Sequence, residues 1–281
     1  QCQVKTSKQL SHQADRQLDT VRRISREHGF GKCSVVWYND CDSIVTVERS
    51  ISMEQEKLSC MFCHRKACET GKPEEYPGFC LTTNAPGKLL AETLEIYRTS
   101  GIDRDIAIAA AEIEGEFYGR ACRAEEIIRF AKKIGAKKIG IASCVGLLSE
   151  AQTFCKILEV NGLQYFGAAC KMGAVDKTEI GLCEEQKIHE GEYEPICNPI
   201  LQAKMLNEEG TDLNVVVGLC VGHDSLFYKY SEAPVTTFIT KDRVMGHNPA
   251  AAVYQANTYY KRLVSEKLEY QSGDLKRDDR Q

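Results

Sequence analysis

Four cysteines, Cys60, Cys63, Cys68 and Cys80, lie in one turn-rich stretch with the spacing C-x2-C-x4-C-x11-C. The first two thiolates can bind one metal centre, and the loop can bring the other two cysteines to the same centre. His64 could replace one of the four cysteines as a ligand. Structural zinc favours two close pairs of ligands, whereas iron–sulfur loops tolerate one tight pair with more distant partners. The spacing therefore predicts a metal site at these four cysteines and favours an iron–sulfur cluster over zinc. The alternative is a structural zinc site that stabilises the loop and has no catalytic role.

A second group of cysteines is separated along the chain. Cys144, Cys170 and Cys220 each end a predicted strand, and Cys197 directly precedes a predicted helix capped by Asn198. The carboxyl ends of parallel strands meet at one edge of a sheet, where ligands bind. We therefore expect the four thiols to line one crevice, as ligands of a second centre or as a thiol-based active site. The alternative is that they are small buried apolar residues, a common role of cysteine.

Catalytic candidates lie next to these thiols. Cys220 could act as a nucleophile with His223 as its base, and Lys171 could stabilise a thiolate or an anionic substrate. A metal-free thiol enzyme is therefore a further alternative, although residues three apart across a strand-helix turn need not face each other. Four more polar residues are predicted near the same crevice: Asp176, Asp224, Asp242 and His247.

The remaining cysteines carry less information. A mid-helix position favours simple packing for Cys155, and we expect the same of Cys122 and Cys183. Cys2, Cys33 and Cys41 have no standard spacing, so no role follows for them. With fourteen cysteines in a chain of 281 residues, metal ligation or thiol chemistry explains the cysteine content better than disulfides, which a reducing cytosol would not keep.

Alternation of strand and helix patterns predicts the fold class. Strands are predicted over residues 137–144, 163–170, 213–220 and 234–240, and helices over 102–117, 123–134, 147–162, 198–210, 223–230 and 248–268. Such repetition predicts an α/β fold, a Rossmann-like open parallel sheet with helices on both faces. This sheet is what must position the second group of thiols.

Four segments are predicted along the chain. Residues 1–56 form a small α/β appendage, with a helix and a hairpin, and residues 57–84 form the cysteine-rich metal-binding loop. Residues 85–268 form the α/β domain, and residues 269–281 form a charged tail that is predicted to be disordered.

Composition excludes several classes of function. The formal net charge is −4 with both signs interspersed, which argues against nucleic-acid partners and anionic membranes. No apolar run approaches the roughly 18 residues that cross a bilayer, and the polar first residues are untypical of a secretion signal. A cytoplasmic protein is therefore predicted. The sequence lacks both G-x-G-x-x-G and G-x-x-x-x-G-K-[ST], which argues against nucleotide enzymes.

The segments KKIGIASCVGLLSEA, ACKMGAVDKTEIG and ICNPILQAKMLNEEGTDLNVVVGLCVGHD, together with the front loop, resemble the family called domain of unknown function 1847. Its members are described only as candidate metal-binding proteins and come largely from anaerobic bacteria and archaea. The resemblance runs from about residue 60 to about residue 260. It implies metal binding at the front loop, and the strand-end cysteines fall inside the matching segments.

The function predicted from these patterns is that of an iron–sulfur protein. The front loop would hold one cluster, of the 4Fe–4S type, and the crevice a second cluster or a thiol-based site, for redox or reductive sulfur chemistry. The expected partners are a redox protein or a small-molecule substrate, and no oligomeric state follows from the sequence. A zinc or soft-metal regulatory or carrier protein without catalysis is the main alternative.

Overall fold

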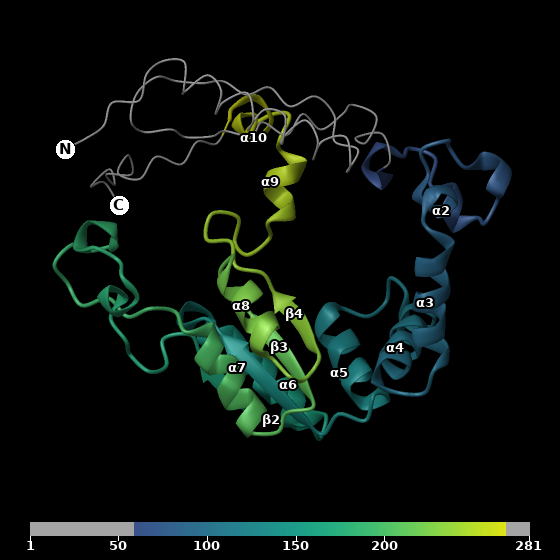
Figure 1. The fold of residues 1–281 in the computed structure, drawn as a ribbon. Coiled ribbons are helices and arrows are strands. Elements are labelled where there is room, and N and C mark those ends of the chain that lie inside the picture. Colours follow the sequence, from purple (N-terminus) through teal and green to yellow (C-terminus); the bar gives the residue numbers. More distant parts are fainter. Residues whose placement is uncertain (1–58, 268–281) are drawn as a thin grey trace, which may run out of the picture. The chain divides into compact units, whose positions relative to one another are not determined.

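The structure, a computed structural model, describes residues 59–267 (Figure 1). The chain divides into two compact units, Gln1–Glu95 and Ile96–Gln281. The predicted N-terminal appendage and the charged tail lie outside the described residues. None of the helices within residues 59–267 is both long enough and apolar enough to cross a membrane.

In the first unit, the cysteine-rich stretch is irregular, as predicted. It contains three single 3-10 turns, η2 (Cys60–Phe62), η3 (Ala67–Glu69) and η4 (Pro73–Glu75), followed by the short helix α2 (Leu81–Asn84). A three-turn helix that the sequence patterns did not predict, α3 (Gly87–Arg98), comes next and contains the boundary between the units.

The second unit contains a four-stranded parallel sheet with the order β2-β1-β3-β4. Its strands are β1 (Lys138–Ser143), β2 (Gln164–Ala169), β3 (Leu213–Val217) and β4 (Val235–Ile239). The prediction of an open parallel sheet is confirmed. Because the chain moves from β1 to β2 on one side and later to β3 on the other, the direction of winding reverses between β1 and β3. This reversal is the place where open α/β sheets bind ligands.

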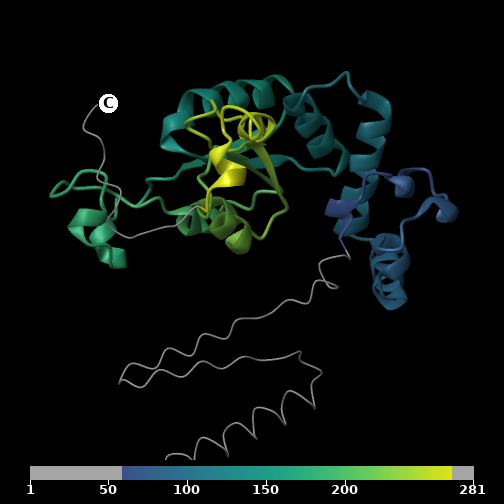
Figure 2. The same ribbon diagram turned by 90° about the horizontal axis from the view of Figure 1, so that it is seen from above.

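Helices cover both faces of the sheet (Figures 1 and 2). One face carries α5 (Arg123–Lys133) and α6 (Leu148–Val160), and the other carries α7 (Pro199–Glu208) and α8 (His223–Tyr230). The helix α4 (Ile102–Phe117) packs against α5. The helices predicted over 102–117, 123–134, 147–162, 198–210 and 223–230 therefore form close to their expected positions.

The two central strands form the core because helices exclude water from both faces. All five residues of β3 are buried, as are five of the six in β1. Ile139, Ile141 and the three consecutive valines of β3 are at most 1% exposed. A nearly continuous apolar run is the usual pattern of a parallel strand covered twice. This packing provides a rigid base for the residues that follow each strand.

The prediction of a single helix over residues 248–268 is wrong. The chain forms two short helices, α9 (Ala250–Tyr254) and α10 (Arg262–Ser265), and residues 255–261 between them form turns. Asn257 and Thr258 have low helix propensity, and the Thr258 hydroxyl donates hydrogen bonds to the carbonyl and side-chain oxygens of Gln255. These local bonds compete with the helical hydrogen-bond pattern.

Candidate functional site

Sheet hydrogen bonding places the first two thiols at one edge. The amide of Cys144 donates to the carbonyl of Val217 at 3.0 Å, and the amide of Cys170 donates to the carbonyl of Ser143 at 2.8 Å. The ladder therefore extends to the residue just after β1 and the residue just after β2. Both cysteines are buried, and both lie at the carboxyl edge of the sheet, as expected.

A long loop, residues 171–197, returns to the same edge before α7. The amide of Asn198 donates to the carbonyl of Cys170 at 2.7 Å, which joins the two ends of this loop. The side chain of Asn198 then caps α7 by accepting a hydrogen bond of 3.0 Å from the amide of Leu201. Cys197 is thereby brought to the thiol of Cys170, as the sequence predicted for the residue preceding this cap.

The thiol of Cys170 interacts with the thiols of both Cys144 and Cys197. A hydrogen bond from the Cys170 thiol lowers the pKa of Cys144, against the opposing effect of burial. A hydrogen bond with Cys170 also lowers the pKa of Cys197, again against burial. The same hydrogen bonds, first to Cys144 and then to Cys197, raise the pKa of Cys170 together with burial. The trio therefore consists of a protonated central thiol between two groups that favour the thiolate form.

Backbone and cationic groups add to this preference at Cys144. The amide of Val145 donates to the Sγ atom of Cys170 at 3.4 Å, and the amide of Gly146 and the ammonium group of Lys241 help to lower the pKa of Cys144. A Cβ atom at Gly146 would lie 3.4 Å from Lys241 Nζ and 3.9 Å from Cys144 Sγ. The lack of a side chain at this position lets the ammonium group approach the sulfur atom.

Cys220 lies at the same edge but has a different partner. Gly218 has a φ of 71°, and a Cβ atom there would lie 2.8 Å from Leu147, so only glycine lets the chain leave β3 in this direction. Two residues later, the Sγ atom of Cys220 accepts a hydrogen bond of 3.3 Å from Arg243 Nη2. This bond raises the pKa of Arg243, and the charges of Cys144 and Cys197 act in the same direction.

The predicted catalytic residues are brought to the site, with one change of partner. The side chain of His223 forms a hydrogen bond with the thiol of Cys197, and Lys171 also helps to lower the pKa of Cys197, although less than Cys170 and His223 do. The Lys171 ammonium group additionally donates to the carbonyl of Pro195. His223 thus acts on Cys197, whereas the sequence analysis paired His223 with Cys220.

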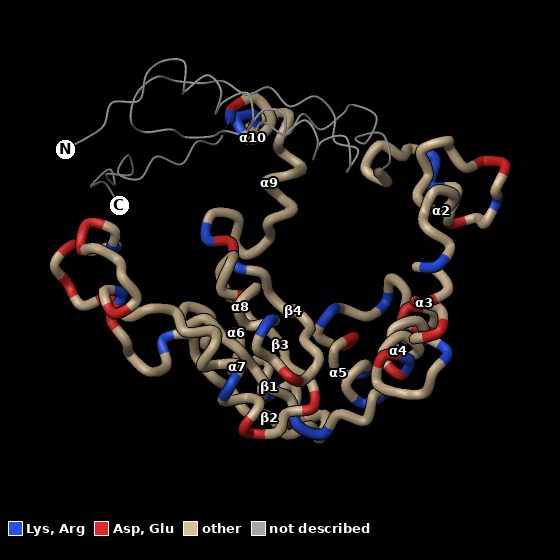
Figure 3. Tube along the Cα trace, viewed as in Figure 1, with Lys and Arg blue, Asp and Glu red and all other residues tan. Residues whose placement is uncertain are grey.

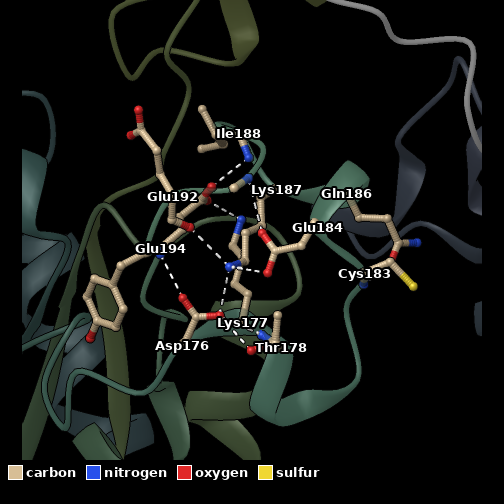
Figure 4. A network of polar contacts seen from close by, with 12 residues as sticks. Asp176, Lys177, Thr178, Cys183, Glu184, Gln186, Lys187, Ile188, Glu192 and Glu194 are labelled. Carbon is tan, nitrogen blue, oxygen red and sulfur yellow. Dashed lines mark hydrogen bonds and ion pairs between the residues drawn. The ribbon is translucent and has the colours of Figure 1, made fainter.

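An ion-pair network folds the loop 171–197 upon itself (Figure 4). The side chain of Lys187 is 4% exposed and lies 2.9 Å from both Asp176 Oδ1 and Glu184 Oε1. Asp176 also accepts hydrogen bonds from the amides of Thr178 and Glu194, at 2.9 and 2.8 Å. These contacts hold together the two arms of the loop that lead to Cys170 and Cys197.

The other polar candidates have local structural partners. Asp176 belongs to this loop network, and the carboxylate of Asp224 accepts a hydrogen bond from the amide of Ser225 at its own helix start. The backbone of Asp242 forms two hydrogen bonds with His247: the amide of His247 donates to the carbonyl of Asp242, and the amide of Asp242 donates to the side-chain Nδ1 of His247.

The front-loop cysteines are placed along successive turns. Cys60 begins η2, Cys63 ends it, Cys68 lies within η3, and Cys80 precedes α2. A hydrogen bond with Thr82 lowers the pKa of Cys80. Within residues 59–267, no group of three or more Cys, His, Asp or Glu side chains surrounds one point at the spacing of a bound metal ion.

Three parts of the site were missed by the sequence patterns. Lys241 and Arg243 follow β4 in a polar loop, and only their position after a strand could have indicated them. Gln202 is fully buried, and its Nε2 atom donates to the carbonyls of Ser143 at 3.1 Å and Ala168 at 2.7 Å. It therefore supports the ends of β1 and β2 directly beneath the thiols.

Comparison with known proteins gives a family without an assigned activity. The family model described as "Protein of unknown function (DUF1847)" matches residues 80–238. The chain is 43% identical over 210 residues to the uncharacterized protein MJ0455 of Methanocaldococcus jannaschii, an alignment that covers 75% of this chain and all of that protein. The matched range of the family model includes Cys144, Cys170, Cys197 and Cys220, and starts at Cys80.

Proposed function

The chain belongs to the DUF1847 family, and we propose that it binds an iron–sulfur cluster at the carboxyl edge of its sheet. The ligands are the thiolates of Cys144, Cys170 and Cys197, with Cys220 as the fourth thiol of the site. The bound cluster would supply electrons for redox or reductive sulfur chemistry, passed to or from a protein partner or a small-molecule substrate.

One observation carries this proposal: Cys170 interacts with both Cys144 and Cys197, thiols from separate parts of the chain, at the carboxyl edge of the sheet. Cysteine used only for packing needs no sulfur partner. Three contacting thiols, with backbone N–H groups and cations directed at them, are instead a set of soft donors.

The chemistry of these donors fits an iron–sulfur group. Metals bind the thiolate form, and the environment of Cys144 and Cys197 lowers the pKa of each, so less free energy is needed to release their protons. Iron–sulfur clusters prefer thiolate ligands, and N–H groups near the sulfur atoms tune their potential. The amide of Val145, which donates to Cys170, is such a group.

We propose the front loop as a second, separate metal centre, held by Cys60, Cys63, Cys68 and Cys80. The support is the spacing of these cysteines and the backbone on which they lie, which forms short 3-10 turns in place of long regular elements. Binding of metal and ordering of such a loop are coupled, so the ligands can gather when the metal arrives.

The test is metal analysis of the full-length chain purified without oxygen, with assays of iron, zinc and acid-labile sulfide and a visible spectrum. Iron with sulfide supports the proposal. Zinc without sulfide would replace it by a zinc-binding regulatory or carrier role. Replacing Cys170 or Cys197 with Ser should remove the iron of the sheet edge, and replacing Cys60 and Cys63 together should remove that of the front loop.

Cys155→Ser is the matched control, because Cys155 is a half-buried cysteine of the same unit on α6. It should keep the iron and sulfide content of the parent. Each variant is first compared with the parent by thermal unfolding. Unchanged iron and sulfide in a folded Cys170→Ser variant would show that the three thiols are packing residues.

A metal-free thiol enzyme is a second candidate, favoured by the hydrogen bond between Cys197 and His223. In this case Cys197 is the nucleophile and the neighbouring imidazole its base. It is the better explanation if the purified chain contains neither metal nor sulfide while Cys197 reacts with an alkylating reagent faster than the exposed Cys183.

A further inference from the structure

The loop between β4 and α9 has a defined turn. Asp242 Oδ1 accepts hydrogen bonds from the amides of Val244 at 3.0 Å and Met245 at 2.8 Å. The amide of His247 donates to the carbonyl of Asp242 at 2.8 Å, which closes the turn. An aspartate that accepts bonds from the following amides is a standard way of fixing such a turn. The residues on either side of Asp242 therefore have fixed backbone positions.

Those two residues are cations directed at thiols. Lys241 Nζ and Cys144 Sγ both lie close to Gly146, 3.4 and 3.9 Å from the position of a Cβ atom there, and Arg243 Nη2 donates to Cys220 Sγ at 3.3 Å. Arg243 is exposed and Cys220 is half-buried, so solvent reaches this corner of the site. The loop thus places two positive charges on the solvent-exposed side of the thiol cluster.

One carboxylate acts on these charges without forming an ion pair: after its hydrogen bond with Ser149, the charges of His247 and Lys241 help to lower the pKa of Glu150. Within the described residues, Lys241, Arg243 and the nearby Lys171 form no ion pair with Asp or Glu, whereas Lys187 binds two carboxylates in its own loop. Residues 240–249 include one acidic residue, Asp242, and Figure 3 shows the charged positions along the chain. However, Asp242 uses Oδ1 to hold its turn. Within the described residues, Lys241 and Arg243 therefore keep positive charges that no carboxylate contacts directly, with Glu150 acting on Lys241 at longer range.

The donor geometry indicates what these cations can bind. A guanidinium group has five N–H donors in a planar fork, and Arg243 donates one hydrogen bond, to Cys220. Such a fork matches the oxygen pairs of carboxylates and tetrahedral oxyanions, while a lysine adds a point charge.

We propose that Lys241 and Arg243 form a binding site for a small anion, a carboxylate or a tetrahedral oxyanion, beside the thiol of Cys220, and that the substrate of the sheet-edge site is such an anion. The role as a substrate site rests on the proposed function. The anion binding itself needs only the two cations and can be tested without metal.

The experiment uses the full-length chain after removal of metal under reducing, oxygen-free conditions. Cys220 is alkylated with iodoacetate or with iodoacetamide, and mass spectrometry gives the rate for each reagent. The two reagents attack the same thiolate and differ mainly in charge, so their rate ratio reports attraction of an anion. The exposed Cys183 provides the reference ratio within the same protein.

We expect a higher iodoacetate-to-iodoacetamide ratio at Cys220 than at Cys183. Arg243→Gln and Lys241→Gln should each lower the ratio at Cys220 about fivefold, the effect of one unit charge a few ångströms away in water. Arg243→Lys should keep most of the preference for iodoacetate at Cys220. Lys204→Gln, a change on α7, should leave the ratio at Cys220 unchanged. Inorganic phosphate or acetate should slow the alkylation of Cys220, and the effect should saturate as the anion concentration rises. The anion that slows alkylation more identifies the type of anion that the site binds.

Equal ratios at Cys220 and Cys183 would overturn the inference, as would the absence of protection by both anions. The inference is also overturned if Arg243→Gln slows alkylation by both reagents to the same extent. In that case Arg243 stabilises the thiolate of Cys220 and does not attract the anionic reagent. These outcomes are independent of the metal assays, so anion binding and cluster binding can fail separately.

Discussion

The amide of Asn198 donates a hydrogen bond of 2.7 Å to the carbonyl of Cys170, which places Cys197 beside the thiol that follows β2. The chain between them, residues 171–197, is held by polar contacts more than by a core of its own. Those contacts centre on Lys187, whose side chain is 4% exposed and binds Asp176 and Glu184. The position of Cys197 in the thiol cluster therefore depends on charges in a loop.

Replacing Lys187 with Met should loosen this loop without unfolding the sheet. Methionine has similar length but leaves two carboxylates without their cation, an unfavourable state for partly buried charges. Hydrogen exchange should become faster at the amides of Lys177 and Ile196, which bond across the loop, and remain slow in β1 and β3. Lys204→Met is the control, and equal protection of Lys177 and Ile196 in both variants would contradict the role of Lys187.

Asp176 should contribute stability at neutral pH that disappears in acid. Hydrogen bonds from the amides of Thr178 and Glu194, together with Lys187, hold the pKa of Asp176 well below its usual value of 3.8. A depressed pKa in the folded state stabilises the fold above the unfolded-state pKa, and this contribution is lost as the pH falls below it. In urea unfolding, the stability difference between the parent and Asp176→Asn should be clear at pH 7 and smaller at pH 3. A difference that does not change with pH would contradict this account.

Gln202→Leu should destabilise the protein by about 1 kcal/mol, because it removes a donor from the buried carbonyls of Ser143 and Ala168. The loss is limited because the Ser143 carbonyl keeps the amide of Cys170 and because the change also removes the buried Gln202 Oε1, which has no hydrogen-bond partner among the described residues. The two side chains have similar volume, so the effect is chiefly that of the lost hydrogen bonds. Urea unfolding measures the change, and Gln152→Leu on the exposed side of α6 is the control. Equal stability of the two variants would mean that water or another donor replaces Gln202.

Gly140→Ala should lower the free energy of unfolding by about 3 kcal/mol. A Cβ atom at Gly140 would lie 1.9 Å from Asn214 Oδ1, and Asn214 is fully buried and accepts a hydrogen bond from Thr211. The added methyl group must displace this side chain, which combines overpacking with a lost hydrogen bond.

Gly167→Ala is the matched control on the neighbouring strand. At Gly167 the nearest atoms to a new Cβ are 4.0 Å away, so alanine fits and should be neutral or slightly stabilising. Thermal unfolding of the two variants compares the same chemical change in β1 and β2. Similar midpoints would show that the packing around Asn214 adapts.

Much of the sheet could be predicted from the sequence, because apolar runs such as Leu213–Val217 are long, β-branched and bounded by turn residues. The position of Cys144 and Cys170 at one edge followed from the rule that parallel strands end on the same side. The strand order β2-β1-β3-β4 was not predictable from these patterns, since it depends on which strands pair.

The partners of the thiols could not be predicted for a related reason. His223 is close to Cys220 in sequence, yet its side chain acts on Cys197, which precedes α7 in a distant segment of the chain. Lys241 and Arg243 lie in a loop whose turn depends on hydrogen bonds to one aspartate. Local patterns carry little information about such contacts between distant segments.

The strand order also has a consequence for assembly. Cys144, Cys170 and Cys197 all precede β3, yet β3 is the strand that pairs directly with β1 and accepts the amide of Cys144. A growing chain that has already emerged past Cys197 therefore still lacks the neighbour that fixes Cys144. This edge of the sheet is therefore complete only after β3 has been synthesised and has paired with β1.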